Sequence, residues 1–371
     1  MSVEKGLAGI VVAQTELSFI DGQEGVLIYR GYPIEELAGR ASFEEVAYLL
    51  WYGLLPNRSQ LDQFVQQLKA EQTLPGPLLE VMRYYPRSTH PMAVLRTAVS
   101  TLGMLDEEAD TTDEAANRRK ALRLMAKMPT IIAAWERIRN DREPIPPHEE
   151  LGHAANYLYM LTGQAPDEAA TRAVETYLIL LAEHGMNAST FACRVAVSTL
   201  ADIYSAVVAG IGTLKGPLHG GANERAMQML LEIGSPERAE AYVLDLLARK
   251  ERVMGMGHRV YKTQDPRARI LKGLAARMSD RRWYDIALEV ERVFLREMVG
   301  KRLYPNVDFY SAPVLYAAGV PIDLFTPTFA ISRVVGWTAH ILEQYADNRL
   351  IRPRAEYVGP KGLKWVPIEA R

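Results

Sequence analysis

Three of the seven histidines lie beside glycines or alanines in short segments that are typical of turns. They are His184 in His-Gly-Met-Asn-Ala-Ser-Thr, His219 in Gly-Pro-Leu-His-Gly-Gly-Ala-Asn and His258 in Gly-Met-Gly-His-Arg-Val-Tyr-Lys. Small neighbours leave room for a substrate around an imidazole, which can exchange a proton near physiological pH. A single histidine more often has a structural role, but three in such settings favour a shared site. Structural roles are expected for His90, His148, His153 and His340, the last of which could also lie behind the site.

Several arginines could hold an anionic substrate beside these histidines. Arg333 interrupts an apolar run at positions 330–337, Arg267 belongs to a cluster that follows His258, and Arg352 lies next to a proline. Burial of an arginine is unfavourable unless an anion meets it, and its forked donors suit carboxylates and phosphates. For Arg333 a structural ion pair is the alternative.

One acidic residue lies among aromatic residues, where it could act as a base. Asp308 is the acid of Tyr-Pro-Asn-Val-Asp-Phe-Tyr. Removal of water from a carboxylate raises its proton affinity, so Asp308 would become a stronger base there. A buried or helix-capping aspartate is the alternative.

Other kinds of site find little support in the sequence. The three histidines are far apart, with no His-x-x-x-His pair and no paired cysteines, which disfavours zinc. Gly255 and Gly257 begin like a dinucleotide-binding fingerprint, but Val260 occupies the third glycine position. A Walker motif and a Gly-x-Ser-x-Gly elbow are both absent from the sequence.

Together, these segments resemble the active-site segments of the citrate synthase family, in the same order and over nearly the whole chain. The resemblance rests on the three histidine segments, Tyr-Pro-Asn-Val-Asp-Phe-Tyr-Ser, Phe-Ala-Ile-Ser-Arg-Val-Val-Gly-Trp and Arg-Pro-Arg-Ala-Glu-Tyr-Val-Gly-Pro. One such segment is only suggestive, whereas the whole set in this order is specific. The resemblance implies an almost entirely helical homodimer, in which each subunit has a large domain and a smaller, mobile domain.

The resemblance also implies a role for each candidate residue. Asp308 matches the base that deprotonates the acyl-CoA methyl group, His219 matches the donor to the thioester oxygen, and His258 matches the group that polarises the keto group of oxaloacetate. The substrate-binding positions are matched by His184, Arg267, Arg333 and Arg352, the last of which would reach the partner's site. The positions that contact CoA are matched by Val253, Gly255, Met256, Gly257 and Lys262.

The implied function is condensation of acetyl-CoA with oxaloacetate to citrate and CoA, through an enolate and hydrolysis of a thioester. The carbon beside a thioester is a weak acid, so this reaction needs a positioned base and a stabilised oxyanion. No metal or cofactor is required, because the CoA thioester is a substrate. The nearest alternative is a 2-methylcitrate synthase, which would use propionyl-CoA with the same residues. A non-catalytic helical binding protein and a metal-dependent hydrolase are more distant alternatives.

The elements that would position these residues are predicted to be helices that follow a short N-terminal β-hairpin. Asp21-Gly22, between apolar runs that begin near Ile10 and at Val26, favours two strands joined by a turn. Ser42 with Glu45, and Ser59 with Asp62, have the spacing of capping boxes that begin helices. Pro91 would open a helix over 92–102, and a helix over 114–139 would be kinked or split by Pro129. Further helices are expected at 166–183, 189–210, 223–233, 236–252, 266–278, 281–299 and 329–345.

The fold class is therefore all-α, and the resemblance divides the chain into two domains. Residues 1–220 and 316–371 would form the large domain, and residues 221–315 the small mobile domain inserted into it. The most apolar long stretch, residues 191–214, is interrupted by Arg194 and Asp202. It therefore favours a buried helix over a membrane span.

Composition limits the classes of function further. The chain has 371 residues, 48% of them hydrophobic, which is enough for a substantial core. Its formal net charge of -2 offers no overall positive field for nucleic acid. Cys193 is the only cysteine, and the N-terminal residues lack the basic and apolar regions of a secretory signal. We therefore expect a cytoplasmic protein without an intramolecular disulfide.

Overall fold

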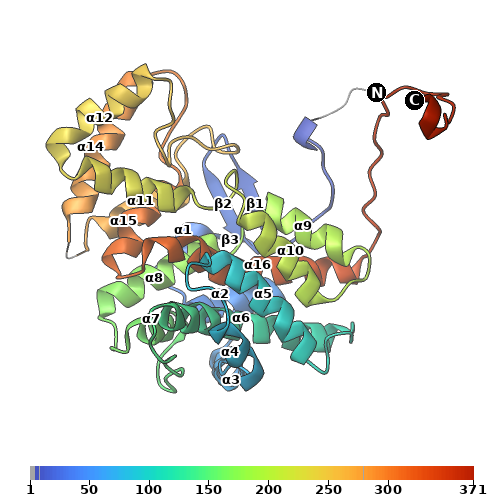
Figure 1. Ribbon diagram of the computed structural model, residues 1–371. Helices are drawn as coiled ribbons and strands as arrows, with labels where there is room; N and C mark the ends of the chain where they lie inside the picture. The colour runs from blue at the N-terminus through green and yellow to red at the C-terminus, as the bar shows by residue number, and fades with distance from the viewer. Residues whose placement is uncertain (1–4, 8, 279) are drawn as a thin grey trace.

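The structure is a computed structural model that describes residues 5–7, 9–278 and 280–371, and most of it is helical (Figure 1). A small antiparallel sheet in the order β1-β2-β3 lies near the N-terminus. Its strands are β1 Ser18–Asp21, β2 Val26–Tyr29 and β3 Tyr32–Pro33. Ser18 pairs with Tyr29 and Asp21 with Val26, which confirms the predicted hairpin. The short strand β3 was not predicted.

A long buried helix, α16, forms the centre of the larger group of helices. It packs against α2, α5, α6, α8, α9 and α10, and every residue from Phe325 to Ile341 is buried. The helices of this group are α1 Ile34–Leu37, α2 Phe43–Tyr52, α3 Arg58–Ala70, α4 Gly76–Arg83, α5 Pro91–Leu105, α6 Glu114–Arg139, α7 His153–Thr162, α8 Glu168–Leu181, α9 Ala188–Val197, α10 Ile203–Leu214 and α16 Phe325–Ala346.

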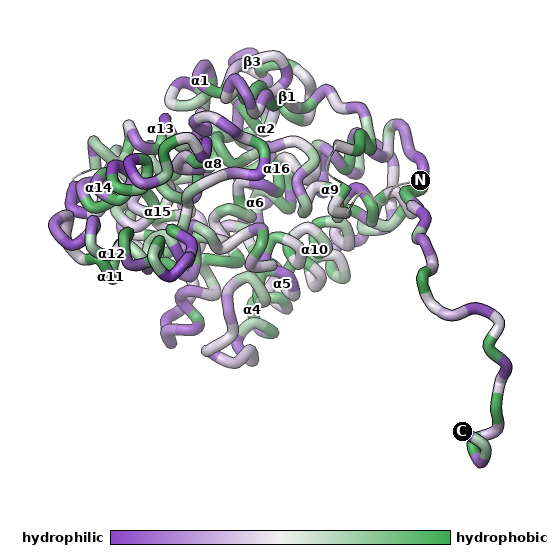
Figure 2. Tube along the Cα trace, turned by 90° about the horizontal axis from the view of Figure 1, so that it is seen from above, coloured by the Kyte–Doolittle hydropathy of each residue, from purple (hydrophilic) through white to green (hydrophobic). Residues whose placement is uncertain are grey.

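A second group of helices lies together at one end of the molecule (Figures 1 and 2). Its members are α11 Ala222–Ile233, α12 Pro236–Ala248, α13 Pro266–Ala275, α14 Arg282–Glu297 and α15 Val307–Ala317. Helices α11 and α13 pack on α15, and α12 packs on α14. Contacts of α15 with α8 and of α11 with α16 join this group to the rest. The group occupies the part of the chain for which the sequence predicts a small domain, and the mobility of that domain stays a prediction.

Local capping explains where two of the helices begin. The predicted capping box of α2 is present, with the backbone N–H of Glu45 donating to Ser42 Oγ at 3.2 Å and the N–H of Ser42 donating to Glu45 Oε2 at 2.7 Å. The box predicted at Ser59 was wrong. Helix α3 begins two residues earlier, because Asn57 and Gln60 form the reciprocal pair instead.

The single helix predicted over residues 189–210 was also wrong, because the chain forms α9 and α10 there. The break includes Leu200, whose φ of 66° lies in the left-handed region, and Asp202, whose side chain accepts from the N–H of Ser205 at 2.9 Å. An aspartate in this position caps a new helix rather than continuing the old one.

Proline occurs inside two other helices. Helix α6 continues through Pro129 as one element, so the predicted split is absent, and burial of the residues from Met128 to Ala134 offsets the lost hydrogen bond. Helix α15 was not predicted, although it carries Asp308 in its first turn. Its sequence includes Pro313, an unusual residue for a helix interior.

Helix α16 holds the C-terminal end of α8 through three carbonyl groups. Ser332 Oγ donates to Leu178 O at 2.5 Å, Arg333 Nε donates to Leu181 O at 2.6 Å, and the N–H of Gly336 donates to Ala182 O at 3.1 Å. A Cβ atom at position 336 would lie 2.3 Å from Ala182 O, so only glycine permits this approach. The turn that follows α8 is thereby fixed on α16.

After α16 the chain leaves the body as an extended arm (Figures 1 and 2). Large hydrophobic side chains are exposed along it, and they are Leu350, Tyr357, Val358, Leu363, Trp365, Val366 and Ile368. In the part of the chain that the structure describes, no helix is both long and apolar enough to cross a membrane.

Candidate active site

His184 lies in the short turn between α8 and α9, where its side chain is buried. Its Nε2 lies 3.1 Å from the hydroxyl of Tyr261, and its ring centroid lies 5.6 Å from that of His258 in an edge-on arrangement. Burial lowers the pKa of His184 well below its usual value, and the nearby positive charge of Arg267 lowers it further. His184 is therefore a neutral group at physiological pH.

His258 is held by its own backbone in a defined tautomer. Its Nδ1 accepts hydrogen bonds from the N–H groups of Val260 at 3.0 Å and Tyr261 at 3.1 Å. Since Nδ1 accepts, the proton of the neutral ring must lie on Nε2. Burial lowers the pKa of His258 to about 4, and the charge of Arg267 acts in the same direction. His258 therefore offers a neutral N–H donor.

His219 lies in the glycine-rich segment between α10 and α11 and has the opposite tautomer. Its Nε2 accepts from the backbone N–H of Ser189 at 3.4 Å and lies 2.8 Å from Ser189 Oγ. A backbone N–H can only donate, so the ring proton must lie on Nδ1. The indole Nε1 of Trp337 donates to Ser189 Oγ at 3.0 Å and fixes that hydroxyl. Burial lowers the pKa of His219 to about 4, with a further contribution from Arg333.

Asp308 lies in the first turn of α15, whose N-terminus is capped by Asn306. Its carboxylate makes no hydrogen bond or ion pair with the described residues. Burial raises the pKa of Asp308 to about 6, although the positive charge of Arg267 opposes the shift. A carboxylate with this pKa is ionised at neutral pH and is a much stronger base than an exposed aspartate.

The loop that carries His258 is bound to the segment that precedes Asp308. The N–H of Gly257 donates to Tyr304 O at 2.8 Å, and the N–H of Asn306 donates to Gly255 O at 2.9 Å. A Cβ atom at Gly255 would lie 2.7 Å from Phe309 Cβ, so the loop packs directly on α15. These contacts make the positions of His258 and Asp308 interdependent.

Two buried arginines complete the centre of the site. Asp265 accepts from Arg267 Nε at 3.0 Å and Nη2 at 2.8 Å, and it also accepts from the N–H of Val307 at 3.2 Å. Arg333 donates from Nε to Leu181 O and has no salt bridge with the described residues. Burial lowers the pKa of Arg333 to about 10, so it remains charged at neutral pH. A buried guanidinium that forms no salt bridge favours an anionic ligand.

Electrostatic coupling shows that these groups share one region. The charges of Arg267 and Arg333 both act on His184 and on Asp308, and the charge of Arg333 also acts on His219. The structure thus brings together six of the residues singled out in the sequence, which are His184, His219, His258, Arg267, Asp308 and Arg333.

Arg352 does not lie with these six residues. It is exposed on the C-terminal arm, and the N–H of its neighbour Ile351 donates to Ser198 Oγ at 3.1 Å. Ser198 ends α9, whereas Asn187 begins that helix beside His184. The length of α9, ~15 Å for ten residues, therefore separates the place of Arg352 from the site within one chain.

The residues proposed to contact CoA fall on the loop next to His258. Val253 is buried, Met256 is half-buried and pairs with Pro305 in an isolated β-bridge, and Lys262 is exposed. Gly255 and Gly257 both have positive φ, at 76° and 85°. Lys262 Nζ donates to Arg259 O at 3.1 Å and to His258 O at 3.5 Å.

Three contacting residues were not singled out from the sequence. Ser189 and Trp337 orient His219, and Tyr261 faces His184. Each lies inside a segment that was recognised for another residue. Hydrogen-bonding side chains within the recognised segments were therefore the available signal.

This arrangement combines one strong carboxylate base, two neutral N–H donors and two buried cations. It suits the removal of a proton beside a carbonyl group, with the resulting oxyanion stabilised by a neutral imidazole. The cations suit a second substrate that carries carboxylates.

Comparison with known proteins agrees with this chemistry. The family profile described as "Citrate synthase, C-terminal domain" matches residues 6–354. The curated protein "Citrate synthase 2" of Bacillus subtilis is 50% identical over 376 residues, with 100% of each chain covered. The "2-methylcitrate synthase" of Mycobacterium tuberculosis is 47% identical over 358 residues, covering 96% of this chain and 91% of its own.

Solved structures show the same fold. A citrate synthase from Thermoplasma acidophilum, in a ternary complex with carboxymethyl coenzyme A and oxaloacetate, matches with a TM-score of 0.94 at 36% identity, covering 99% of each chain. A citrate synthase from Thermotoga maritima matches with a TM-score of 0.90 at 42% identity, covering 100% of this chain and 99% of its own.

Proposed function

The chain belongs to the citrate synthase family, and we propose that it condenses acetyl-CoA with oxaloacetate to give citrate and CoA. It is an enzyme of the transferase type. The observation that carries the proposal is the combination of Asp308, a carboxylate with a raised pKa, with the neutral donors of His219 and His258.

In the first step Asp308 removes a proton from the methyl group of acetyl-CoA. The electron pair of the broken C–H bond moves onto the thioester oxygen and gives an enolate. The Nδ1–H of His219 donates to that oxygen, because its Nε2 is occupied by Ser189. A positioned base and an oxyanion donor each contribute on the order of 10²–10⁴-fold.

In the second step the enolate carbon attacks the keto carbon of oxaloacetate. The Nε2–H of His258 polarises that carbonyl, since its Nδ1 is occupied by two backbone N–H groups. Arg267 and Arg333 would bind the two carboxylates of oxaloacetate, with His184 beside them. The resulting alkoxide takes up a proton, which balances the one that Asp308 removed. Water then cleaves the thioester of the condensed product and gives the new carboxylate of citrate, the thiol of CoA and one proton. No redox change occurs in any step.

The substrates are supported by the relative from Thermoplasma acidophilum, which was solved with a CoA analogue and oxaloacetate. For CoA we propose the loop of Val253, Gly255, Met256 and Gly257, with Lys262 at its edge. The reaction needs no resident metal or cofactor, because the proton, the electrons and the leaving group are all accounted for by the two substrates and water.

We propose that the active form is a homodimer in which Arg352 enters the partner's site. Two features support this. Arg352 lies about the length of α9 from the turn of His184 in its own chain, and the arm that carries it exposes hydrophobic side chains such as Trp365, at 78% exposure, and Val358, at 90% exposure. A second copy would cover these side chains.

The small domain of residues 221–315 is proposed to close over the bound substrates. His258, Arg267 and Asp308 come from this part of the chain, whereas His184 and Arg333 come from the large domain. Relative movement would therefore assemble the site and exclude water. A cytoplasmic location also stays a proposal, with which the free, buried Cys193 is compatible.

The direct test is a steady-state assay of thiol release with oxaloacetate and either acetyl-CoA or propionyl-CoA. We expect a higher kcat/KM with acetyl-CoA. The relative named 2-methylcitrate synthase makes propionyl-CoA the second candidate, and one methylene is worth only ~1–3 kcal/mol in a pocket. A higher kcat/KM with propionyl-CoA would assign the alternative activity, and no thiol release with either would reject both.

Replacing the base should remove turnover while leaving oxaloacetate binding in place. Asp308→Asn keeps the shape of the side chain but cannot accept the methyl proton, so kcat should fall by about 10²-fold or more. Asp62→Asn, at a side chain that is 59% exposed on α3, is the matched control and should leave kcat unchanged. Full activity of Asp308→Asn would exclude Asp308 as the base.

The pH dependence of kcat/KM should report the ionisation of Asp308. Its pKa is raised to about 6, and only the ionised form accepts a proton. Activity should therefore be high at neutral pH and fall as the pH drops through about 6. His219 and His258 have pKa values of about 4 and stay neutral over this range, so they add no second decline. A profile that stays flat down to about pH 5 would contradict this assignment.

Mixed dimers should reveal whether Arg352 acts across the interface. Arg352→Ala and Arg333→Ala should each impair use of oxaloacetate. In a heterodimer of the two variants, one site would combine its own Arg333 with the partner's Arg352, so turnover should partly recover. If Arg352 acts within its own chain, both sites lack one arginine, and a verified heterodimer should show no recovery.

A further inference from the structure

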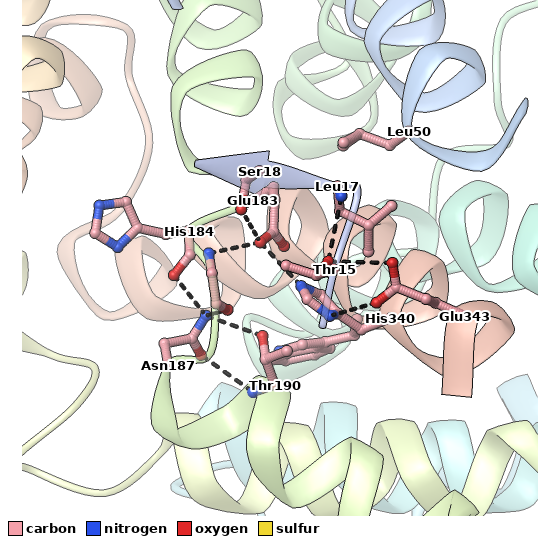
Figure 3. A network of polar contacts seen from close by, with 12 residues as sticks. Thr15, Leu17, Ser18, Leu50, Glu183, His184, Asn187, Thr190, His340 and Glu343 are labelled. Carbon is pink, nitrogen blue, oxygen red and sulfur yellow. Dashed lines mark hydrogen bonds and ion pairs between the residues drawn. The ribbon is translucent and has the colours of Figure 1, made fainter. Parts of the chain in front are cut away.

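Behind His184 lies a network of buried polar side chains that the proposed reaction does not use (Figure 3). Its centre is Glu183, which has no exposed surface. Glu183 Oε1 accepts from Ser18 Oγ at 2.9 Å and from the N–H of Gly185 at 2.5 Å, and it lies 3.0 Å from His340 Nε2. Figure 3 shows Glu183 between Ser18 and His340, while the ring of His184 points away from it.

The network continues from His340 toward the N-terminal segment. His340 Nδ1 lies 3.0 Å from Arg194 Nη1, which in turn donates to Glu343 Oε2 at 2.7 Å. Glu343 Oε1 accepts from the N–H of Glu16 at 3.0 Å and from Thr15 Oγ1 at 3.2 Å. Two buried ionic groups, Glu183 and Arg194, are therefore linked through one imidazole.

The partners of His340 determine its tautomer. A guanidinium has only donors, so Nδ1 must accept from Arg194 and the ring proton must lie on Nε2, where it is donated to Glu183. Burial tends to raise the pKa of Glu183, but His340, Arg333 and Ser18 together hold that pKa below its usual value. The carboxylate is therefore ionised and fully buried.

Packing alone does not explain such a network. Burial of ions carries a large desolvation cost. A protein in which well-packed hydrophobic residues replace such ions is often equally stable or more stable. What the network does fix is the backbone on both sides of His184. Glu183 Oε1 holds the N–H of Gly185, whose φ of 57° is in the left-handed region, and the hydroxyl of Tyr29 donates to Glu183 O at 2.7 Å.

Helix α16 supplies three supports for this turn from one face. Arg333, Trp337 and His340 are spaced by four and three residues, so they lie on the same side of the helix. Arg333 binds the carbonyl of Leu181 and Trp337 binds Ser189, which orients His219. His340 binds Glu183 between these two points. One buried helix thus sets the positions of both His184 and His219.

We propose that Glu183 and His340 are positioning residues that hold the turn of residues 182–187 in the orientation in which His184 meets oxaloacetate. This role rests on the proposed function, because it concerns the support of that same substrate site. Neither residue touches the substrate. Arg194 and Glu343 extend the support to the N-terminal segment.

Two amide variants of His340 test the proposal. The amide nitrogen of glutamine reaches the place of Nε2 and can still donate to Glu183, whereas the shorter asparagine side chain cannot. For His340→Asn we expect the KM for oxaloacetate to rise roughly tenfold to a hundredfold. Loss of a residue that orients a metal-binding histidine in other proteins has an effect of this size on affinity or activity. The KM for acetyl-CoA should change little. His340→Gln should restore most of the affinity for oxaloacetate.

A second measurement does not depend on activity. The imidazole ¹⁵N resonances of His184 should move in His340→Asn and stay near their wild-type values in His340→Gln. If the wild-type enzyme does not turn over the two substrates, the proposed function fails, while these resonances still decide the positioning role. Unchanged KM and unchanged His184 resonances in folded His340→Asn would overturn the proposal, as would equal effects of the two variants.

Should the His340 variants not fold, Ser18→Ala provides the test. It removes one donor to Glu183 Oε1 from the half-buried edge of β1. A smaller but selective rise in the KM for oxaloacetate is expected, together with a shift of the His184 resonances. Ser205→Ala, at an exposed capping position of α10, is the matched control and should change neither. If Ser18→Ala behaves like this control, the network has no positioning role.

Discussion

Removal of water from ionisable side chains is the constraint on which the rest of the site depends. The same burial raises the pKa of Asp308 to about 6 and lowers the pKa values of His219 and His258 to about 4. Because a carboxylate is charged when deprotonated and an imidazole when protonated, one environment moves them in opposite directions. The result is a base that is ionised at neutral pH beside two donors that carry no charge.

The fold provides this environment by joining segments that are distant in the sequence. The loop of His258 is hydrogen-bonded to the segment before Asp308, and Asp265 links Arg267 to the start of the helix that carries this base. On the other side, α16 holds the turn of His184 through buried polar contacts. Helical packing gives such segments fixed positions.

Much of the site could be predicted from the sequence, because its histidines, its aspartate and two of its arginines lie in short segments with distinctive neighbours. The hairpin around Asp21 and the capping box of Ser42 were also predictable, since they depend on local interactions. The split between α9 and α10 was not, because a positive φ at Leu200 is not evident from its residue type. Nor could the role of Glu183 be predicted, since it depends on Ser18 and His340, which are 165 and 157 residues away.

The most direct test of this account is the ¹⁵N NMR spectrum of the imidazole groups in the substrate-free protein at about neutral pH. The hydrogen bonds predict that the rings of His219 and His258 are both neutral, with the proton on Nδ1 of His219 and on Nε2 of His258. Each ring would then present its N–H to a substrate oxygen. A charged imidazolium at either position, or a proton on Nε2 of His219 or on Nδ1 of His258, would contradict the account.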